Sequence, residues 1–423
     1  MTELSRRDLL ALMAVGASTA GLSSGSAAAG RSGKETALDA LRIRAIVAGV
    51  EISGPGDKAP VEKAVARLLL ARQRAHDAGF EVQTLRVATN PVIAPLDAEQ
   101  RHAALGPLRE LDAVVAAHEA MLSIGPVSTA NRFEPQLGDW AAELARTTRM
   151  ISFSVAVSSP EEGIHRDAIR SAAHVISALA RVDATGAANF RFAAAAGIPA
   201  GTPFFPVAYH RGASSIAFGV ESAGLVQAAF TGLASPADAE GRLRELLERK
   251  LGQIERLGRE IAAAGSMQYL GIDPSPAPGL DRSIGTAIET LTGVPFGHPS
   301  TLQACATITA VLKSLKVQTC GYAGLMLPVL EDPTLALRAH ERRYGLQELL
   351  LYSAVCGTGL DVVPLPGDID VTALSQIIGD VATLAVRLRK PLSARLFPAP
   401  GRKSGDMVRF ADERLVECRV FDI

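Results

Sequence analysis

Residues 42–50 read RIRAIVAGV, residues 60–78 read PVEKAVARLLLARQRAHDA and residues 81–87 read EVQTLRV. The first and third stretches are short apolar runs typical of β-strands, whereas the long stretch between them has a helical pattern. A strand, a helix and a second strand in this order favour two parallel strands joined by a helix that covers the sheet. This part of the chain therefore predicts an α/β fold.

The same alternation continues almost to the C-terminus. Further strands are predicted at Met150–Ser158, Asn189–Ala195, Phe204–Tyr209, Ser215–Val220, Met267–Ile272, Leu325–Leu330 and Leu360–Leu365. Further helices are predicted at Ala98–Ala120, Gly138–Thr147, His165–Arg181, Ser300–Leu315, Leu346–Val355 and Val371–Arg389. We therefore expect an α/β architecture with parallel strands.

The clearest single helix is predicted at Pro236–Ala264. Ser235 can cap its first turn, Pro236 suits the first helical position, and Asp238 stands where a capping box places its acidic residue. Leucine and isoleucine recur along it at steps of three and four residues, with charged residues off that stripe. We expect a structural helix that faces the core, with a coiled-coil interface as the alternative.

Composition excludes several classes of protein. The 423 residues are 48% hydrophobic and 21% charged, which suffices for one large domain and excludes a disordered chain or a small disulfide scaffold. There are 43 lysines and arginines against 44 acidic residues, and no run of either sign stands out to bind a phosphate backbone. Trp140 is the single tryptophan, so there is little material for base stacking. Nucleic acid is therefore not an expected partner.

Residues 1–29 have the pattern of an export signal. The pair Arg6 and Arg7 precedes an apolar stretch from Leu9 to about Leu22, and small residues follow up to Ala29. The arginine pair indicates a signal peptide of the twin-arginine type, with cleavage after Ala29. A disordered terminus or a retained anchor is the alternative reading of this segment.

The signal sets the expected location and organisation. We expect export by the twin-arginine translocase to the periplasm or the extracellular space. A linker is predicted at residues 30–40 and the folded domain at residues 41–423, where we expect no membrane span.

Standard cofactor and catalytic motifs are missing. The sequence has neither a GxxxxGK[ST] loop nor a strand-linked GxGxxG, so there is no nucleotide signature. It also lacks HExxH, and its one GxSxG match, Gly21–Gly25, lies in the predicted leader rather than in the folded domain. The four cysteines show no CxxC spacing, which argues against a zinc knuckle. The cofactor stays unknown, and a divalent metal is allowed by the remaining polar residues.

Two candidate residues follow predicted strands. His210 comes after an apolar run and precedes Arg211 and Gly212, where it could act as a general base or a metal ligand. Asp273 enters a proline-rich loop that contains Ser275, and such a stiff loop would hold a carboxylate in fixed geometry as a base or ligand. A loop histidine bonded to backbone and an ordinary Asp–Pro turn are the structural alternatives.

A third candidate region precedes the predicted helix at residues 300–315. Ser300 can cap this helix, and its free N–H groups, with Thr301, could bind an anion beside His298. Capping alone explains Ser300 but not the histidine. Cys305, inside the helix, is most simply a small buried apolar residue.

Two glycine-flanked cysteines complete the candidates. Cys320 precedes a predicted strand, and Cys356 stands at the end of a helix, five residues before Asp361. Glycine beside a cysteine leaves room for a substrate to reach the sulfur, as a nucleophile requires. Helix capping by glycine and core packing of Cys356 are the alternatives.

Taken together, these residues resemble an uncharacterised prokaryotic family, domain of unknown function family 711. The matching stretches are Phe204–Gly212, Gly271–Ser283, Gly297–Leu302, Cys320–Leu330, Cys356–Pro366 and Gly405–Phe410, in the family's order. Weaker similarity extends over nearly the whole chain after the leader. The leader itself departs from typical members, which look cytoplasmic.

The resemblance implies a fold more than a reaction. It implies one α/β barrel of two similar halves, like the barrel of pyruvate formate-lyase, with loops that enter the barrel, and a homo-oligomer. It marks six family-pattern positions without assigning their roles: His210, Asp273, Ser275, His298, Cys356 and Asp361. A glycyl-radical mechanism is not supported, because similarity of fold does not transfer chemistry.

Two functional hypotheses follow. The first is an exported enzyme that acts on a small anionic metabolite, with Cys356 as nucleophile, His210 and His298 as acid/base groups or metal ligands, and Asp273 as an orienting or ligating group. Ser275, Ser300, Thr301, Cys320 and Asp361 are then the candidate substrate-binding residues. The second is a non-catalytic protein that binds or senses a small ligand in the same pocket. A structural metal site formed by His210, Asp273 and His298 is a third reading.

Overall fold

The strand–helix–strand unit predicted at the start of the domain is present in the computed structural model, which describes residues 41–410 and 412–423. Strand β1 (Arg42–Val50) pairs in parallel with β2 (Val82–Thr89), and helix α2 (Lys58–Asp77) connects them. The predicted signal peptide (residues 1–29) and linker (residues 30–40) lie outside the described residues.

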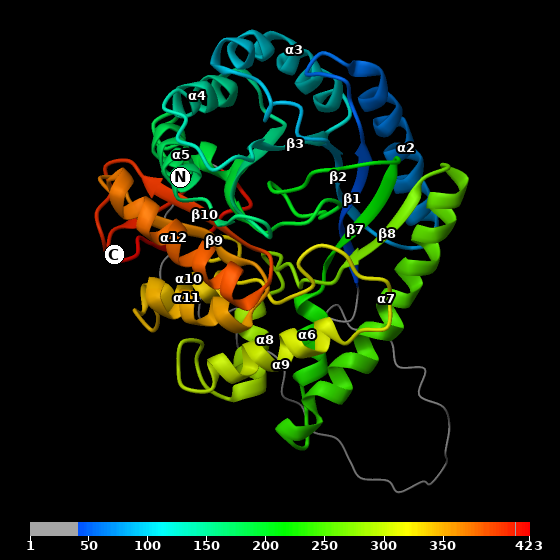
Figure 1. The fold of residues 1–423 in the computed structure, drawn as a ribbon. Coiled ribbons are helices and arrows are strands. Elements are labelled where there is room, and N and C mark those ends of the chain that lie inside the picture. The colour runs from blue at the N-terminus through cyan, green and yellow to red at the C-terminus, as the bar shows by residue number, and fades with distance from the viewer. Residues whose placement is uncertain (1–40, 411) are drawn as a thin grey trace, which may run out of the picture. The chain divides into compact units, whose positions relative to one another are not determined.

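Three more parallel strands extend this unit on the far side of β2. They are β3 (Ala120–Ser128), β4 (Ile151–Ser159) and β6 (Phe192–Ala196), each paired in parallel with its neighbour. The helices α3 (Ala98–Ala116), α4 (Leu137–Thr147) and α5 (Arg166–Leu179) stand between them in sequence. Figure 1 shows the sheet curved, with α2, α3, α4 and α5 along its outer side. The predicted α/β fold is confirmed.

The C-terminal half of the domain adds strands at both edges of this group. On one side β7 (Ser215–Glu221) is antiparallel to β1 and parallel to β8 (Gln268–Asp273). On the other side β10 (Leu392–Ala399) is antiparallel to β6 and parallel to β9 (Gly359–Pro366). The order is β8-β7-β1-β2-β3-β4-β6-β10-β9, so the sheet is mostly parallel with two antiparallel junctions.

The predicted closed barrel is not confirmed, because the ladder of strands runs as an open path from β8 to β9. The backbone of segment 319–328 pairs with each edge strand through one isolated bridge. Thr319 bridges to Ile272 of β8, and Pro328 bridges to Asp361 of β9.

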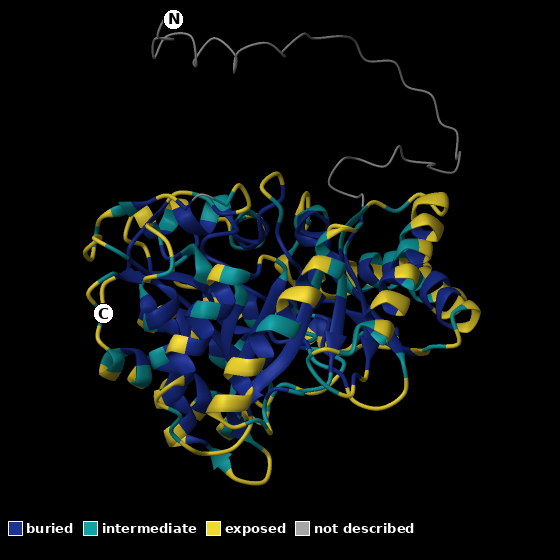
Figure 2. Cartoon of the chain, turned by 90° about the horizontal axis from the view of Figure 1, so that it is seen from above, coloured by how far each residue is buried: buried dark blue, intermediate teal, exposed yellow. Residues whose placement is uncertain are grey.

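The two faces of the sheet carry side chains of different size. Ile43, Leu85 and Val87 belong to the large core that the outer helices share. On the opposite face Ala45 and Ala88 form a separate small cluster with Ala208 of the β6–β7 connection. Small inward residues leave room for this connection, and the hydroxyl of Ser123 on β3 donates to the Pro206 carbonyl at 3.1 Å. The strands are thus covered on both faces and coloured as buried in Figure 2.

The remaining elements complete the covering layer. The helices are α6 (Ala223–Phe230), α7 (Ala239–Ala264), α8 (Ile284–Thr292), α9 (Thr301–Lys313), α10 (Pro333–His340), α11 (Leu346–Val355) and α12 (Val371–Leu388). The short elements are the 3-10 turns η2 (Ala187–Arg191) and η3 (Pro236–Asp238), and the strands β5 (Gly163–Ile164), β11 (Met407–Val408) and β12 (Cys418–Arg419).

The long helix predicted at Pro236–Ala264 is confirmed with a different beginning. The Ser235 hydroxyl accepts from the Ala237 N–H at 3.2 Å, but residues 236–238 form a 3-10 turn before α7 begins. The predicted capping box is wrong, since the Asp238 side chain makes no cap hydrogen bond. The leucine stripe is buried as expected, because it faces the core.

Helix α12 differs from expectation in hydropathy. Its 18 residues are long and apolar enough, by length and composition, to cross a membrane, whereas we expected no such run. One face of α12 packs against α5 and β10, with Leu374, Ile378 and Val381 buried. A core helix of a globular domain passes the same test of hydropathy.

Several strand predictions were wrong for local reasons. The run Phe204–Tyr209 is a connection rather than a strand, since Pro203 and Pro206 lack the N–H that a ladder needs. Leu325–Leu330 makes only the single bridge at Pro328. Two real strands, β3 and β10, were missed: the helix predicted to Ala120 covered the start of β3, and prolines interrupt both strands.

Candidate functional site

The described structure has a pocket of about 370 Å³ on the inner side of the sheet, which we call the central pocket. The first residues of β1 and β2 and the last residues of β7 and β8 line it. These ends meet at one edge because β7 is antiparallel to β1. Its charged lining residues are Arg42, Arg44, Arg86, Arg395, Arg414, Glu221, Asp273, Asp281, Glu331 and Asp361. Its apolar walls include Met121, Phe190, Phe204, Phe205, Leu280 and Met326.

Glu221 organises one side of the pocket. Its side chain is 1% exposed and accepts a hydrogen bond from Arg42 at 2.8 Å, with Gln83 donating to the other carboxylate oxygen. Arg42 also pairs with Asp281 of the β8–α8 loop at 3.1 Å. The hydrogen bond to Asp281 is the main reason that the pKa of Arg42 lies above its ordinary value. This side is therefore a paired network that ties the loop to β1.

Arg395 organises the opposite side. This buried guanidinium on β10 donates to Asp361 of β9 at 2.8 Å and lies 3.4 Å from Glu331. Glu331 also accepts from Arg44 at 2.9 Å. Burial raises the pKa of Asp361 above its ordinary value, although Arg395 acts in the other direction. Two carboxyl groups thus share one buried cation inside the pocket.

Arg86 has a different environment. Its Nε donates to the Thr84 hydroxyl at 3.2 Å, and one terminal nitrogen donates to the Pro203 carbonyl at 3.3 Å. Among the described residues no carboxylate forms an ion pair with Arg86, whose guanidinium lies 5.6 Å from the centre of the Phe205 ring. Burial, together with neighbouring guanidinium groups, lowers the pKa of Arg86 to about 9. A cation in this setting is a ready partner for an anion that enters the pocket.

Asp273 and Ser275 also line the central pocket, and their contacts are with the protein. The Asp273 carboxylate accepts from the Ser275 hydroxyl at 2.6 Å and from the backbone N–H of Tyr322 at 3.0 Å. Burial raises the pKa of Asp273 despite these bonds. A side chain at Gly321 would come within 2.3 Å of the carboxylate, so the glycine lets this loop close over Asp273. The arrangement fixes the segment that bridges both sheet edges.

Cys356 lies outside the central pocket. It is fully buried where α11 ends, and its backbone carbonyl accepts from the Lys390 ammonium at 2.5 Å. A side chain on Gly357 would come within 2.3 Å of Gly324, so the glycine allows two backbones to approach. The open space that the sequence suggested beside the sulfur is therefore occupied by protein.

The other cysteines are free thiols like Cys356. Burial raises the pKa of Cys305, in α9, well above its ordinary value. Burial likewise raises the pKa of Cys320, which follows the bridge to β8 and does not line the pocket. A raised pKa keeps these thiols protonated and poorly nucleophilic at neutral pH.

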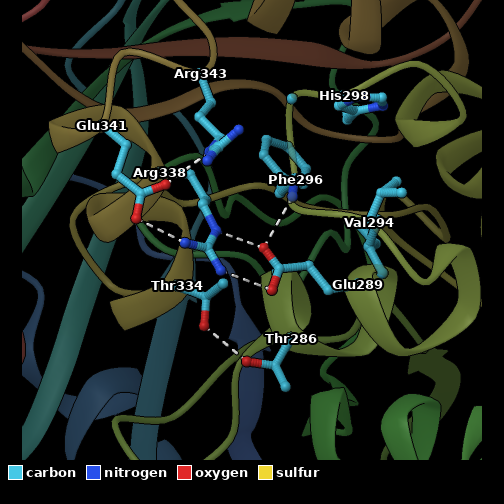
Figure 3. A network of polar contacts seen from close by, with 12 residues as sticks. Thr286, Glu289, Val294, Phe296, His298, Thr334, Arg338, Glu341 and Arg343 are labelled. Atoms are coloured by element: carbon cyan, nitrogen blue, oxygen red, sulfur yellow. Dashed lines mark hydrogen bonds and ion pairs between the residues drawn. The ribbon is translucent and has the colours of Figure 1, made fainter.

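The two candidate histidines lie apart from the pocket. His210 is 2% exposed, and its ring bonds to the Gly212 carbonyl at 2.9 Å and the Ser215 hydroxyl at 3.2 Å. The backbone N–H of His210 donates to the carbonyl of Thr89, which lies at the C-terminal end of β2. This end is opposite to the one that lines the pocket. His298 is exposed in the loop before α9, beyond Phe296 in Figure 3.

The predicted anion site at the start of α9 is not built as expected. Ser300 is exposed with a positive φ of 92°, and its side chain makes no cap hydrogen bond. The Thr301 hydroxyl instead donates to the His298 carbonyl at 2.8 Å, which closes the turn. Neither residue lines the central pocket.

The three residues of the predicted metal site are not brought together. Within residues 41–410 and 412–423 no group of three or more His, Cys, Asp or Glu side chains could hold a metal ion. Asp273 is in the pocket, His210 is at the other end of β2, and His298 is on the surface.

A second cluster of arginines and carboxylates joins two helices, and we call it the α8–α10 network. In Figure 3 Glu289 of α8 receives two hydrogen bonds from Arg338 of α10, at 2.7 and 3.0 Å. The Phe296 N–H adds a third, and Glu341 pairs with Arg338 and Arg343. Hydrogen bonds from Arg338 hold the pKa of Glu289 below its ordinary value although burial opposes this. Glu289, Arg338, Glu341 and Arg343, which Figure 3 labels, each have a partner of opposite charge.

Sequence reasoning missed the residues that dominate the pocket: Arg42, Arg44, Arg86, Glu221, Glu331 and Arg395. A signal was present, because charged residues interrupt apolar strands in RIRAIV, TLRVAT and SARLFP. A charge inside a buried strand is rare unless it is paired or functional.

Comparison with known proteins places the chain among uncharacterised relatives. The family model described as Uncharacterised ACR (DUF711) matches residues 37–412. A UPF0210 protein of Pyrobaculum islandicum is 31% identical over 368 residues, covering 82% of this chain and 80% of the relative. A UPF0210 protein of Desulforudis audaxviator is 28% identical over 402 residues and 88% of each chain. The family-model match spans the strands that carry Arg42, Arg44, Arg86 and Arg395.

Proposed function

This chain belongs to the family described as Uncharacterised ACR (DUF711), and we propose that it is an enzyme that acts on a small anionic metabolite in the central pocket. The observation that carries the proposal is the guanidinium of Arg86, which lines the pocket and has no carboxylate partner among the described residues. An unpaired cation in a confined space costs free energy that a bound anion would recover.

The chemistry is assigned to carboxyl groups rather than to a cysteine. Cys356, His210 and His298 do not line the central pocket, whereas Asp361 and Glu331 do. Burial raises the pKa of Asp361, which favours a protonated carboxyl group that could donate a proton and take it back. Arg395 would stabilise the negative charge of Asp361 and Glu331, and Arg86 would bind the anionic group of the substrate.

The first test separates anion binding at Arg86 from adventitious binding. Thermal unfolding of the full chain is followed with acetate, malonate and inorganic phosphate, in the parent protein and in Arg86→Gln. We expect at least one anion to raise the Tm of the parent and not that of the variant. Arg343→Gln, on the surface in the α8–α10 network, is the matched control and should respond like the parent. Equal responses in parent and Arg86→Gln would contradict the proposal.

The second test concerns turnover. The parent and Asp361→Asn are incubated with a defined mixture of carboxylate and phosphate metabolites, and the mixture is analysed by mass spectrometry. We expect a metabolite to be consumed by the parent only. Binding without consumption in either protein would support the alternative function.

That alternative is a non-catalytic binding protein. It is favoured by one observation, since each lining carboxylate has a cationic or backbone donor in the described structure. Carboxylates held in this way shape and neutralise a binding pocket without acting as free bases.

We propose that the segment 319–328 closes the sheet into a barrel like that of pyruvate formate-lyase. The bridges of Thr319 to β8 and of Pro328 to β9 support this. The antiparallel junctions divide the strands into a group of five and a second group that includes β7, β8, β9 and β10, as two similar halves require.

We also propose that the protein is a homo-oligomer. Leu337, Leu351 and Leu388 are exposed on α10, α11 and α12, which supports an interface on these helices. Light scattering after size exclusion should give a mass above the 44.2 kDa of one chain.

Export by the twin-arginine route is the last part of the proposal. The arginine pair at Arg6 and Arg7 supports it. In cells fractionated after expression, the parent should be in the periplasm or medium, and Arg6→Lys/Arg7→Lys should stay in the cytoplasm. Identical fractionation of the two would contradict it.

A further inference from the structure

The charge balance of the central pocket limits the charge of its ligand. Four lining arginines already have carboxylate partners: Arg42, Arg44, Arg395 and Arg414 pair with Glu221, Glu331, Asp361 and Asp412. Among the described lining residues this leaves Arg86 as the cation without a carboxylate. The described lining has five arginines and five carboxylates, so it carries no excess of positive charge, and a single guanidinium without an ion-pair partner suits a ligand with no more than one negative charge.

The remaining donors of Arg86 suit a carboxylate. Its Nε and one terminal N–H are used by Thr84 and Pro203. One further N–H on that terminal nitrogen and two on the other stay available, and adjacent terminal N–H groups form the fork that binds both oxygens of a carboxylate. A phosphate dianion would bring a second negative charge and more acceptors than this fork can satisfy.

The surroundings of Arg86 suit an apolar body. Phe204 lines the same pocket and is partly exposed, with its ring 6.0 Å from the Arg395 guanidinium and edge-on to the Tyr322 ring at 5.0 Å. Met121 and Met326 add flexible apolar walls, and the pocket volume of about 370 Å³ is in the range of small-molecule sites. A ligand anchored on Arg86 by two oxygens would place the rest of its surface against these side chains.

We infer that the central pocket selects a monocarboxylate with an apolar body, such as an aryl or branched aliphatic acid, with its carboxylate on Arg86 and its body beside Phe204. The inference rests on the proposed function, which requires only that a small anion binds. It adds the ligand's charge and the apolar character of its body.

Titration calorimetry with matched probes tests the inference. The probes are phenylacetate, its neutral analogue phenylacetamide, acetate and inorganic phosphate, each titrated into the full chain. We expect phenylacetate to bind about tenfold or more tightly than acetate or phosphate, because it alone offers both the carboxylate and the body.

Variants separate the two contributions. Arg86→Gln should weaken phenylacetate about tenfold and leave phenylacetamide within about twofold, since a single charged hydrogen-bonding contact is removed. Phe204→Ala should weaken both aryl probes and leave acetate unchanged. Arg86→Lys keeps the charge and loses the fork, so it should fall between the parent and Arg86→Gln. Circular dichroism confirms that each variant is folded.

The outcomes distinguish this inference from the proposed function. Equal affinity for acetate and phenylacetate would contradict the inference that the ligand has an apolar body. Binding of phosphate that is tighter than that of phenylacetate and depends on Arg86 would contradict the inference that the ligand is a monocarboxylate. In both cases an anion-binding pocket remains. No binding of any anion would overturn the proposed function as well.

Discussion

The central pocket and the α8–α10 network are built from the same residue types, but Arg86 and Asp361 of the pocket differ in their electrostatics from the paired charges of the network. In the network Arg338 and Glu289 bond to each other, and each shifts the other's pKa towards the charged form. In the pocket Arg86 has a pKa lowered to about 9, chiefly by burial, and burial raises the pKa of Asp361. Both pocket shifts favour the neutral form.

The difference shows what each cluster contributes. A cluster whose charges satisfy each other stabilises the contact between two helices. A cluster that leaves one guanidinium without an ion-pair partner gains little stability from it, which is the expected property of a binding site. Four predictions test this contrast, from the largest expected effect to the smallest.

Arg395→Met should have the largest effect. The substitution leaves Asp361 and Glu331 without their shared cation, and breaking a buried pair in this way costs about 3–5 kcal/mol. Urea unfolding at pH 8 measures the free energy of unfolding. Asp361→Asn in the same background should recover part of the loss, and a loss below about 1 kcal/mol in Arg395→Met would show that the pair is not stabilising.

Glu289→Gln should have an intermediate effect. Glu289 is 20% exposed and accepts two hydrogen bonds from Arg338, so the loss of its charge should cost about 1–2 kcal/mol in the same assay. Arg343→Met, at the exposed end of the network, is the control and should change stability by about 0.5 kcal/mol or less. Equal effects would mean that burial does not distinguish the two positions.

The pH dependence should have opposite signs in the two clusters. The pKa of Glu289 is lowered, so its contribution is present above its ordinary value of 4.5 and is lost as the pH falls below that value. The pKa of Asp361 is raised, so its contribution is present below 3.8 and is lost as the pH rises through the raised value. The stability difference between parent and Glu289→Gln should therefore shrink on acidification. On acidification the parent should gain stability relative to Asp361→Asn. Parallel pH profiles of the two stability differences would contradict the contrast between the clusters.

Arg86→Gln should have the smallest effect on stability. Arg86 makes two long hydrogen bonds and no ion pair among the described residues, so its loss should change the free energy of unfolding by less than about 1 kcal/mol. The same variant should lose the anion-dependent rise in Tm. A large destabilisation would contradict this prediction, because it would show that Arg86 stabilises the fold as Arg395 is expected to do.

The sequence predicted the fold class and several elements well. Periodicity located β1, α2 and the buried stripe of α7, because these elements bury one face against a continuous core. It missed β3 and β10, which contain prolines, and it assigned a strand to Phe204–Tyr209, which fills the inner side of the sheet instead. The local pattern of apolar residues indicates burial, but it does not distinguish a buried strand from a buried loop, and both occur here.

The candidate site was predicted in part. Asp273, Ser275 and Asp361 do line the pocket. Cys356 was chosen because glycines stand beside it, and His210 because it follows a predicted strand, but the structure shows both residues packed against other parts of the protein. Gly357 allows close approach of Gly324, and Gly49 leaves space for the His210 ring. One chain cannot reveal whether a glycine makes room for a ligand or for another part of the protein.

By itself the sequence determined that this chain forms a large α/β domain, because the order and period of its apolar runs require strands and helices that cover one another. Only the tertiary structure decided where the chemistry lies. The ends of β1 and β2 come beside those of β7, β8, β9 and β10 because two junctions in the sheet are antiparallel. Residues as distant in sequence as Arg44, Glu331 and Arg395 then share one pocket, and pairing among them leaves Arg86 without an ion-pair partner among the described residues. Charge balance depends on distances in space, which no spacing along the chain specifies.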